Sequence, residues 1–97
     1  MNIVNYTEYS NDLDKFIKKH SKKSDLHIWT SPIENGEYRK EYLFEDGASF
    51  YEINKMNYSE QTEIEIHGIW VMVEVNMIKH EYFSTDEGIS KYWYEKA

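Results

Sequence analysis

The sequence predicts an α+β domain with an N-terminal helix, a four- to five-stranded antiparallel meander sheet and a short C-terminal helix. An apolar period of three to four residues over 7–23 indicates the first helix, and a change to alternation from residue 25 indicates strands. Asn-Gly at 35–36 and Asp-Gly at 46–47 are hairpin-turn signals between those strands. The length of 97 residues is typical of one domain, so we expect 1–97 to form a single unit.

Residues 7–23 are predicted to form an amphipathic helix. Its apolar side chains and one histidine fall on a single face: Tyr9, Leu13, Phe16, Ile17 and His20. Thr7 or Ser10 can cap its N-terminus. The basic run "KFIKKHSKK" lies at the C-terminal end, where the helix dipole favours cations. We therefore interpret this run as the polar half of the helix rather than as a nucleic-acid-binding patch.

The next segments are predicted to form a three-stranded meander. "DLHIWTSPI", "EYRKEYLFE" and "ASFYEIN" alternate in polarity and are separated by the two turn signals. Alternation in the middle strand separates two faces. One face carries Tyr38, Lys40, Tyr42 and Phe44, and the other carries Glu37, Arg39, Glu41, Leu43 and Glu45.

The second half of the predicted sheet contains the most apolar segment of the chain. Residues 54–61 are polar and predict a loop, and glutamate then alternates with isoleucine before Gly68. Gly68 is consistent with either a bulge in one long strand or a turn between two strands. "IWVMVEV" is apolar on both faces, which predicts a central strand covered on both sides with Trp70 packed. Residues 79–85 predict a last short strand.

The C-terminal segment, residues 84–97, is predicted to form a short helix. Ser84 and Glu87 have the spacing of a capping box. Ile89, Tyr92 and Trp93 follow at helical spacing. We expect the three tryptophans to be core or partly buried residues: Trp29, Trp70 and Trp93.

The composition narrows the classes of partner and compartment. A formal net charge of −7 disfavours direct nucleic-acid binding and binding to an anionic membrane. The absence of cysteine excludes disulfides and thiolate zinc sites, and the N-terminal residues lack the pattern of a signal peptide. We therefore expect a cytoplasmic protein. Ten lysines against one arginine, with frequent Asn, Ile and Tyr, are typical of an AT-rich bacterial or phage genome, so the host cytoplasm is the expected compartment if a phage encodes the chain.

No catalytic or cofactor motif stands out, and we expect no cofactor and no metal. The four histidines lack metal-ligand spacing, and the chain has no phosphate-binding loop and no nucleophile elbow. A small enzyme that uses His67 or His80 in a cleft remains a less favoured alternative.

The charge is distributed unevenly along the chain. Residues 1–24 hold five lysines against three acids, whereas residues 25–97 hold six basic residues against fifteen acids. This asymmetry favours an acidic, tyrosine-rich surface that docks on a basic protein, such as a nucleic-acid enzyme. The partner-binding residues we predict are Glu37, Glu41, Glu45, Glu63, Glu65, Asp86, Glu87, Tyr38, Tyr42 and Tyr94.

Our functional hypothesis is a small inhibitor or accessory protein of a phage-like mobile element. It would act against host defence or inhibit a nuclease, and its rows of carboxylates would mimic the phosphates of a nucleic acid. The alternatives are a toxin-immunity protein and a homo-oligomeric structural protein whose sheet edges pair between subunits. The acidic face can also be a solvated surface with no partner.

Overall fold

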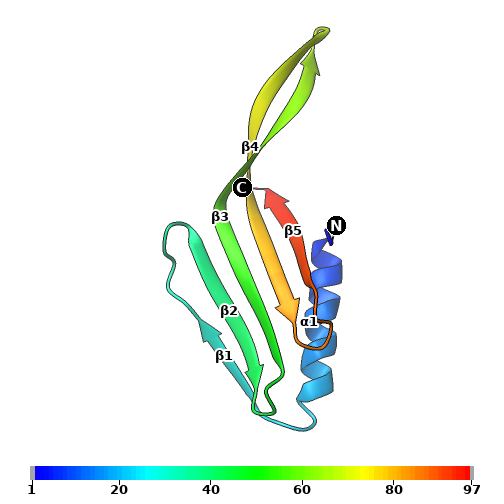
Figure 1. Ribbon diagram of the computed structural model, residues 1–97, viewed down its shortest axis with the longest axis vertical. Coiled ribbons are helices and arrows are strands. Elements are labelled where there is room, and N and C mark those ends of the chain that lie inside the picture. The colour runs from blue at the N-terminus through cyan, green and yellow to red at the C-terminus, as the bar shows by residue number, and fades with distance from the viewer. Residues whose placement is uncertain (1, 97) are drawn as a thin grey trace.

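Within residues 2–96, which the computed structural model describes, one helix packs on a single five-stranded antiparallel sheet (Figure 1). The strands are hydrogen-bonded in chain order, as a meander requires. The elements are α1 (Tyr6–His20), β1 (Leu26–Thr30), β2 (Glu37–Phe44), β3 (Ser49–Ile66), β4 (Ile69–Ser84) and β5 (Ser90–Lys96). The α+β class and the five-stranded sheet are confirmed.

Helix α1 forms close to its predicted position, with a different cap. The side chain of Asn5 accepts a hydrogen bond from the Glu8 backbone N–H at 2.8 Å, so the helix begins before Thr7 and Ser10. Its last turn carries Lys18 and Lys19, as the dipole argument predicts. The helix has 15 residues, and no helix among the described residues is long and apolar enough to cross a membrane.

Helix α1 covers one face of the sheet through an aromatic core. Phe50 on β3 stacks on Tyr82 of β4 with ring centroids 5.2 Å apart, and Phe16 of α1 lies 5.7 Å from Phe50. The buried core residues are Phe16, Tyr42, Phe44, Phe50, Tyr82 and Trp93. Large rings allow a small domain to bury enough apolar area with few residues.

The two predicted meander turns are present. Asn35 and Gly36 both have positive φ, at 52° and 72°, as a type I′ turn requires. Gly47 closes the next turn with φ 93°. In the β2–β3 register, Tyr42 is paired with Phe50, which places both on the helix-covered face.

The predicted C-terminal helix is wrong, because residues 90–96 form strand β5. Gly88 has φ 71°, which a right-handed helix excludes. The expected capping residues instead build a turn, in which the Ser84 carbonyl accepts the Gly88 N–H at 2.9 Å. After this turn the chain alternates, with Trp93 buried and its neighbours on the opposite face.

The predicted loop at 54–61 is also wrong, because β3 continues through it for 18 residues in all. A bulge between Lys55 and Tyr58 shifts the register but does not end the pairing with β4. The expectation that residues 69–75 form a covered central strand is wrong too, since the first part of β4 is exposed. Both errors concern the same feature, a hairpin that extends past the sheet.

Candidate functional site: the β3–β4 arm

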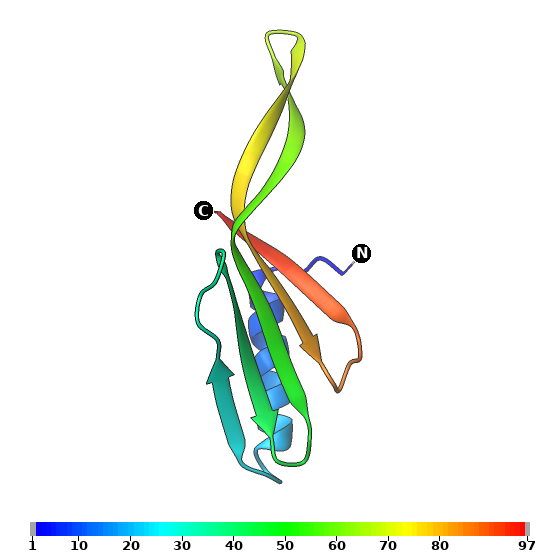
Figure 2. The same cartoon turned by 60° about the vertical axis from the view of Figure 1, so that its left-hand side comes forward.

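The distal parts of β3 and β4 form a two-stranded arm, which we define as residues 58–77. Strand β2 stops pairing with β3 at Lys55, and β5 stops pairing with β4 at Met77. Beyond these points β3 and β4 pair only with each other, from Ser59–Asn76 to Ile66–Ile69. The arm therefore projects from the domain as a twisted ribbon, which Figures 1 and 2 show. The molecule measures 60 Å along its long axis.

The base of the arm is held by the turn between β1 and β2. The Gly36 carbonyl accepts a hydrogen bond from the Met56 N–H at 2.6 Å. Gly36 has φ 72°, which favours glycine, and a Cβ atom there would lie 2.5 Å from the Asn57 side-chain nitrogen, so that any other residue would displace the Asn57 side chain. This contact fixes where the arm leaves the sheet.

The tip of the arm is a two-residue turn. His67 and Gly68 have φ values of 50° and 80°, both in the left-handed region. Gly68 therefore marks a turn between two strands rather than a bulge in one, as a type I′ hairpin allows. His67 lies at this exposed tip and not in a cleft, so the geometry gives no support to a catalytic role for it.

The register divides the arm into two chemically different faces, because directly paired residues of antiparallel strands point to the same side. Ile64 is paired with Val71, whereas Glu65 is paired with Trp70. We call the first side the apolar face; its members are Thr62, Ile64, Ile66, Ile69, Val71, Val73 and Val75. We call the second side the acidic face; its members are Gln61, Glu63, Glu65, Trp70, Met72 and Glu74.

Nothing in the described part of the chain covers either face. From 59 to 76 every residue is exposed except Val73, which is half-buried. Ile69 is 67% and Trp70 is 65% exposed. An exposed apolar ribbon of this kind is typical of an interaction site in a folded protein.

The arm also holds unneutralised charge. Residues 58–77 contain four glutamates and no lysine or arginine. Glu60 accepts a hydrogen bond from the Tyr58 hydroxyl at 2.7 Å, and this bond raises the pKa of Tyr58. Among the ion pairs of residues 2–96, none involves Glu63, Glu65 or Glu74. These three carboxylates are therefore free to attract a cationic partner.

The predicted acids Asp86 and Glu87, in contrast, are paired within the domain. Asp86 lies 2.8 Å from the His20 ring nitrogen and 3.5 Å from the Lys19 ammonium. Glu87 lies 2.7 Å from the Lys91 ammonium. Asp86 thus holds the β4–β5 loop against the C-terminal end of α1, and Glu87 connects the same loop to β5.

The predicted residues on β2 do not join the arm either. Tyr42 is only 7% exposed and belongs to the core, so its prediction as a partner contact is withdrawn. Glu41 accepts a hydrogen bond from the Ser49 hydroxyl at 2.8 Å. Tyr38 and Glu37 are half-buried, and Glu45 is exposed directly after β2, whose C-terminal end lies away from the arm (Figure 1).

Tyr94 lies at the base of the arm. Its ring stacks on Tyr58 with centroids 5.7 Å apart, and the Lys79 ammonium lies 5.1 Å from the Tyr58 ring. Of the ten predicted residues, only Glu63 and Glu65 lie on the arm itself. Sequence reasoning missed Trp70, Met72 and Glu74, although Glu74 within an apolar run was a signal that one face of that strand meets water.

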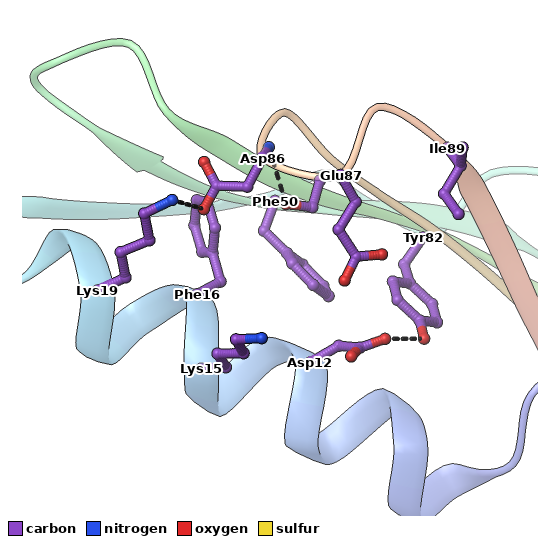
Figure 3. A pocket seen from close by; sticks show the side chains of 10 residues that line it. Asp12, Lys15, Phe16, Lys19, Phe50, Tyr82, Asp86, Glu87 and Ile89 are labelled. Atoms are coloured by element: carbon purple, nitrogen blue, oxygen red, sulfur yellow. Dashed lines mark hydrogen bonds and ion pairs between the residues drawn. The ribbon is translucent and has the colours of Figure 1, made fainter.

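The cleft beneath the β4–β5 loop, with a volume of about 200 Å³, shows no catalytic arrangement (Figure 3). Its central carboxylate, Asp12, accepts hydrogen bonds from the Tyr82 hydroxyl at 2.8 Å and the Lys91 ammonium at 2.9 Å. His80 is outside this lining and stacks on Trp93 at 4.0 Å. No group of three metal-ligating side chains occurs among residues 2–96. The polar groups here connect helix to sheet.

Comparisons with protein-family models, with curated proteins and with solved structures find no match to this chain.

Proposed function

We propose that the protein is a small binding protein that inhibits a basic partner by docking the acidic face of its arm. The observation that carries this proposal is a projecting ribbon on which exposed Trp70 is framed by unpaired carboxylates. The proposed docking surface is therefore smaller than the acidic surface inferred from the sequence, because it lies on the arm alone. Glu37, Glu41, Asp86 and Glu87 are engaged or partly buried in the domain and are not part of the docking face.

The acidic face combines the two elements that charged interfaces need. Glu63 and Glu65 are two residues apart on one strand, so their side chains emerge about 6.8 Å apart. Glu74 is diagonal to Glu63 across the strands and extends the negative patch. Such a patch accelerates encounter with a cationic surface. Trp70 and Met72 supply apolar contact area, and tryptophan is enriched among residues that dominate binding energy.

The partner we favour is a nucleic-acid enzyme of a host defence system, in keeping with an accessory protein of a phage-like element. A basic groove that binds a phosphate backbone attracts closely spaced carboxylates by the same electrostatic interaction. A projecting ribbon reaches into a groove that the flat face of a sheet cannot enter. These features support nucleic-acid mimicry by the arm.

The test compares two triple variants of equal charge change. In the first, Glu63, Glu65 and Glu74 are replaced by glutamine. In the matched control, three exposed acids outside the arm are neutralised: Asp25→Asn, Glu34→Gln and Glu45→Gln. Each protein is immobilised, used for capture from source-cell extract at low salt, and eluted with increasing salt.

We expect the wild type and the control to retain a basic protein that elutes as salt rises, and the arm variant to lose it. With the purified partner, Trp70→Ala should raise the dissociation rate at least tenfold, as for an interface residue worth about 2 kcal/mol. Equal capture by the arm variant and the wild type would show that the acidic face is only a solvated surface.

A further inference from the structure

The apolar face of the arm is a continuous β-branched strip with no cover in residues 2–96. Of its seven members only Thr62 has a polar group, and all except Val73 are exposed. Glu60 is the one charged residue on this side of the arm, and it lies near the base within reach of the Tyr58 and Tyr94 hydroxyls. The strip thus has the composition of a sandwich interior and the exposure of a surface.

We propose that the apolar face is the contact surface for a second copy of this chain. Two arms pack apolar face to apolar face, antiparallel to each other, about a twofold axis near Thr62 and its cross-strand partner Val73. The product is a small four-stranded sandwich, with sheets about 10 Å apart. This inference goes beyond the proposed function and uses the opposite face of the arm.

Charge is the first reason to choose a second copy. The strip carries no carboxylate that would attract a basic partner, whereas Glu63, Glu65 and Glu74 all point to the other side. Two copies can therefore meet without placing these carboxylates in the contact. A face of uniform β-branched residues is also self-complementary, as a twofold contact requires.

The area is the second reason. The exposed parts of the residues of the strip amount to roughly 500 Å² per copy, so a face-to-face pair buries at most about 1,000 Å² in total, which is the lower limit of a specific interface. An area of this size fits a dimer that forms at micromolar or higher concentration. It also fits a face that can remain exposed in a dilute monomer.

Charge repulsion selects the antiparallel arrangement. Each copy carries a net charge of −7. The arm has nine paired positions on each strand, so its length is about 30 Å. Antiparallel packing separates the two domains by this length, which exceeds the Debye length of about 8 Å at physiological salt. Parallel packing would place the two acidic domains side by side.

Cross-linking tests the face and the direction. The chain has no cysteine, so single cysteines provide a clean readout. Thr62→Cys and Gln61→Cys are adjacent, exposed and on opposite faces, which makes them a matched pair. With a bismaleimide that spans about 10 Å, we expect Thr62→Cys to form cross-linked dimer at least tenfold faster than Gln61→Cys. Equal rates overturn the proposal.

A third variant, Ile66→Cys at the tip of the arm, tests the direction. In an antiparallel pair the two tips are at opposite ends, so this variant should form no more cross-linked dimer than Gln61→Cys. Efficient cross-linking of Ile66→Cys would overturn the antiparallel arrangement.

Mass measurement provides an independent test. Sedimentation equilibrium from 5 µM to 500 µM should show wild-type chains shifting from monomer to dimer. The dimer should not weaken as the salt concentration rises, because salt screens the repulsion between the acidic copies, with a Debye length of about 10 Å at 0.1 M. Val71→Asp should raise the dimer dissociation constant about 100-fold, since it buries an unpaired charge. Met72→Asp, on the acidic face, should not.

A wild type that stays monomeric throughout this range overturns the dimer. If Val71→Asp then also abolishes partner capture, the apolar face binds the partner instead of a second copy. The same measurements distinguish this dimer from the proposed function. Partner capture should weaken as salt rises and should depend on Glu63, Glu65 and Glu74, whereas dimer formation should not weaken with salt and should not depend on these carboxylates.

Discussion

Removal of the distal part of the arm should leave the stability of the domain nearly unchanged. The variant replaces residues 61–74 with Asn-Gly, so that Glu60 and Val75 flank the new turn. These two residues are register partners on the same face as Ile66 and Ile69, which flank the natural turn. The new hairpin therefore keeps the pairing pattern that a two-residue type I′ turn needs.

The expected change follows from the burial of the deleted residues. Within 61–74 every residue is exposed except Val73, which is half-buried, so the deletion removes little buried apolar surface. It also removes the ordering cost of the backbone, about 1–2 kcal/mol for each residue. An isolated two-stranded hairpin is marginally stable, because its cross-strand hydrogen bonds and side-chain contacts roughly offset this ordering cost. The free energy of unfolding should therefore change by at most about 1 kcal/mol.

Urea unfolding of dilute protein, followed by fluorescence of buried Trp93, measures this change. Phe50→Ala serves as the positive control, because loss of a fully buried ring should cost about 3–5 kcal/mol. A loss above about 2 kcal/mol for the shortened chain would show that the arm supports the core, and the separation of arm from domain would be refuted.

Three further predictions concern the domain and the base of the arm. Burial, and then the hydrogen bond to Asp12, raise the pKa of Tyr82. The protonated hydroxyl therefore contributes to the free energy of unfolding below the ordinary tyrosine pKa of about 10, and this contribution is lost as pH rises above that value. Tyr82→Phe should cost about 1 kcal/mol at neutral pH and flatten the alkaline decline in urea midpoints between pH 8 and 11; an unchanged decline would contradict this. Gly36→Ala should lower the melting temperature more than Gly47→Ala, because both have positive φ but only Gly36 faces a close atom, Asn57; equal losses would show that the contact is unimportant. Neutralising the four lysines at and just after the end of α1 should leave partner capture intact, and lost capture would move the binding surface to this end of the helix: Lys18→Gln, Lys19→Gln, Lys22→Gln and Lys23→Gln.

The helix and the meander could be predicted because local signals and packing agree there. The period of 7–23 brings Phe16 to the core, and the two glycine turns fix short hairpins. The alternation of β2 correctly separates Tyr42 from Glu41. In each case the residues that form the element also determine which face is buried.

The C-terminal strand could not be predicted from local spacing. Ser84 and Glu87 satisfy the pattern of a capping box, but the pattern does not exclude a single turn. β4 offers a free edge beside this segment, and pairing with it satisfies the backbone from Ser90 to Lys96. The N-terminal residues also contribute, because the Val4 N–H donates to the Tyr92 carbonyl at 2.9 Å. Long-range pairing thus outweighs the helical spacing.

The arm could not be predicted because the apolar character of a strand does not indicate whether another part of the same chain covers it. "IWVMVEV" reads as a buried strand when cover is assumed to come from the same chain. One helix of 15 residues covers only the part of the sheet next to the core. The remaining length of β3 and β4 has no partner element, and this follows from the tertiary arrangement rather than from residues 69–75.

The basic run at the end of α1 sharpens the contrast between domain and arm. Lys18 pairs with Asp14 at 2.8 Å, and Lys19 lies 3.5 Å from Asp86, so these cations offset acids of the domain. The domain outside 58–77 contains fourteen acids and eleven basic residues, whereas the arm contains four acids and no lysine or arginine. More than half of the net charge of −7 therefore resides on an element that projects from the domain. Charge interactions decay within about 8 Å in physiological salt, so a cationic molecule that approaches the arm is attracted by the carboxylates of the arm and not by those of the domain. The lysines act by keeping the domain close to neutral, and the negative field of the molecule is concentrated where Trp70 is exposed.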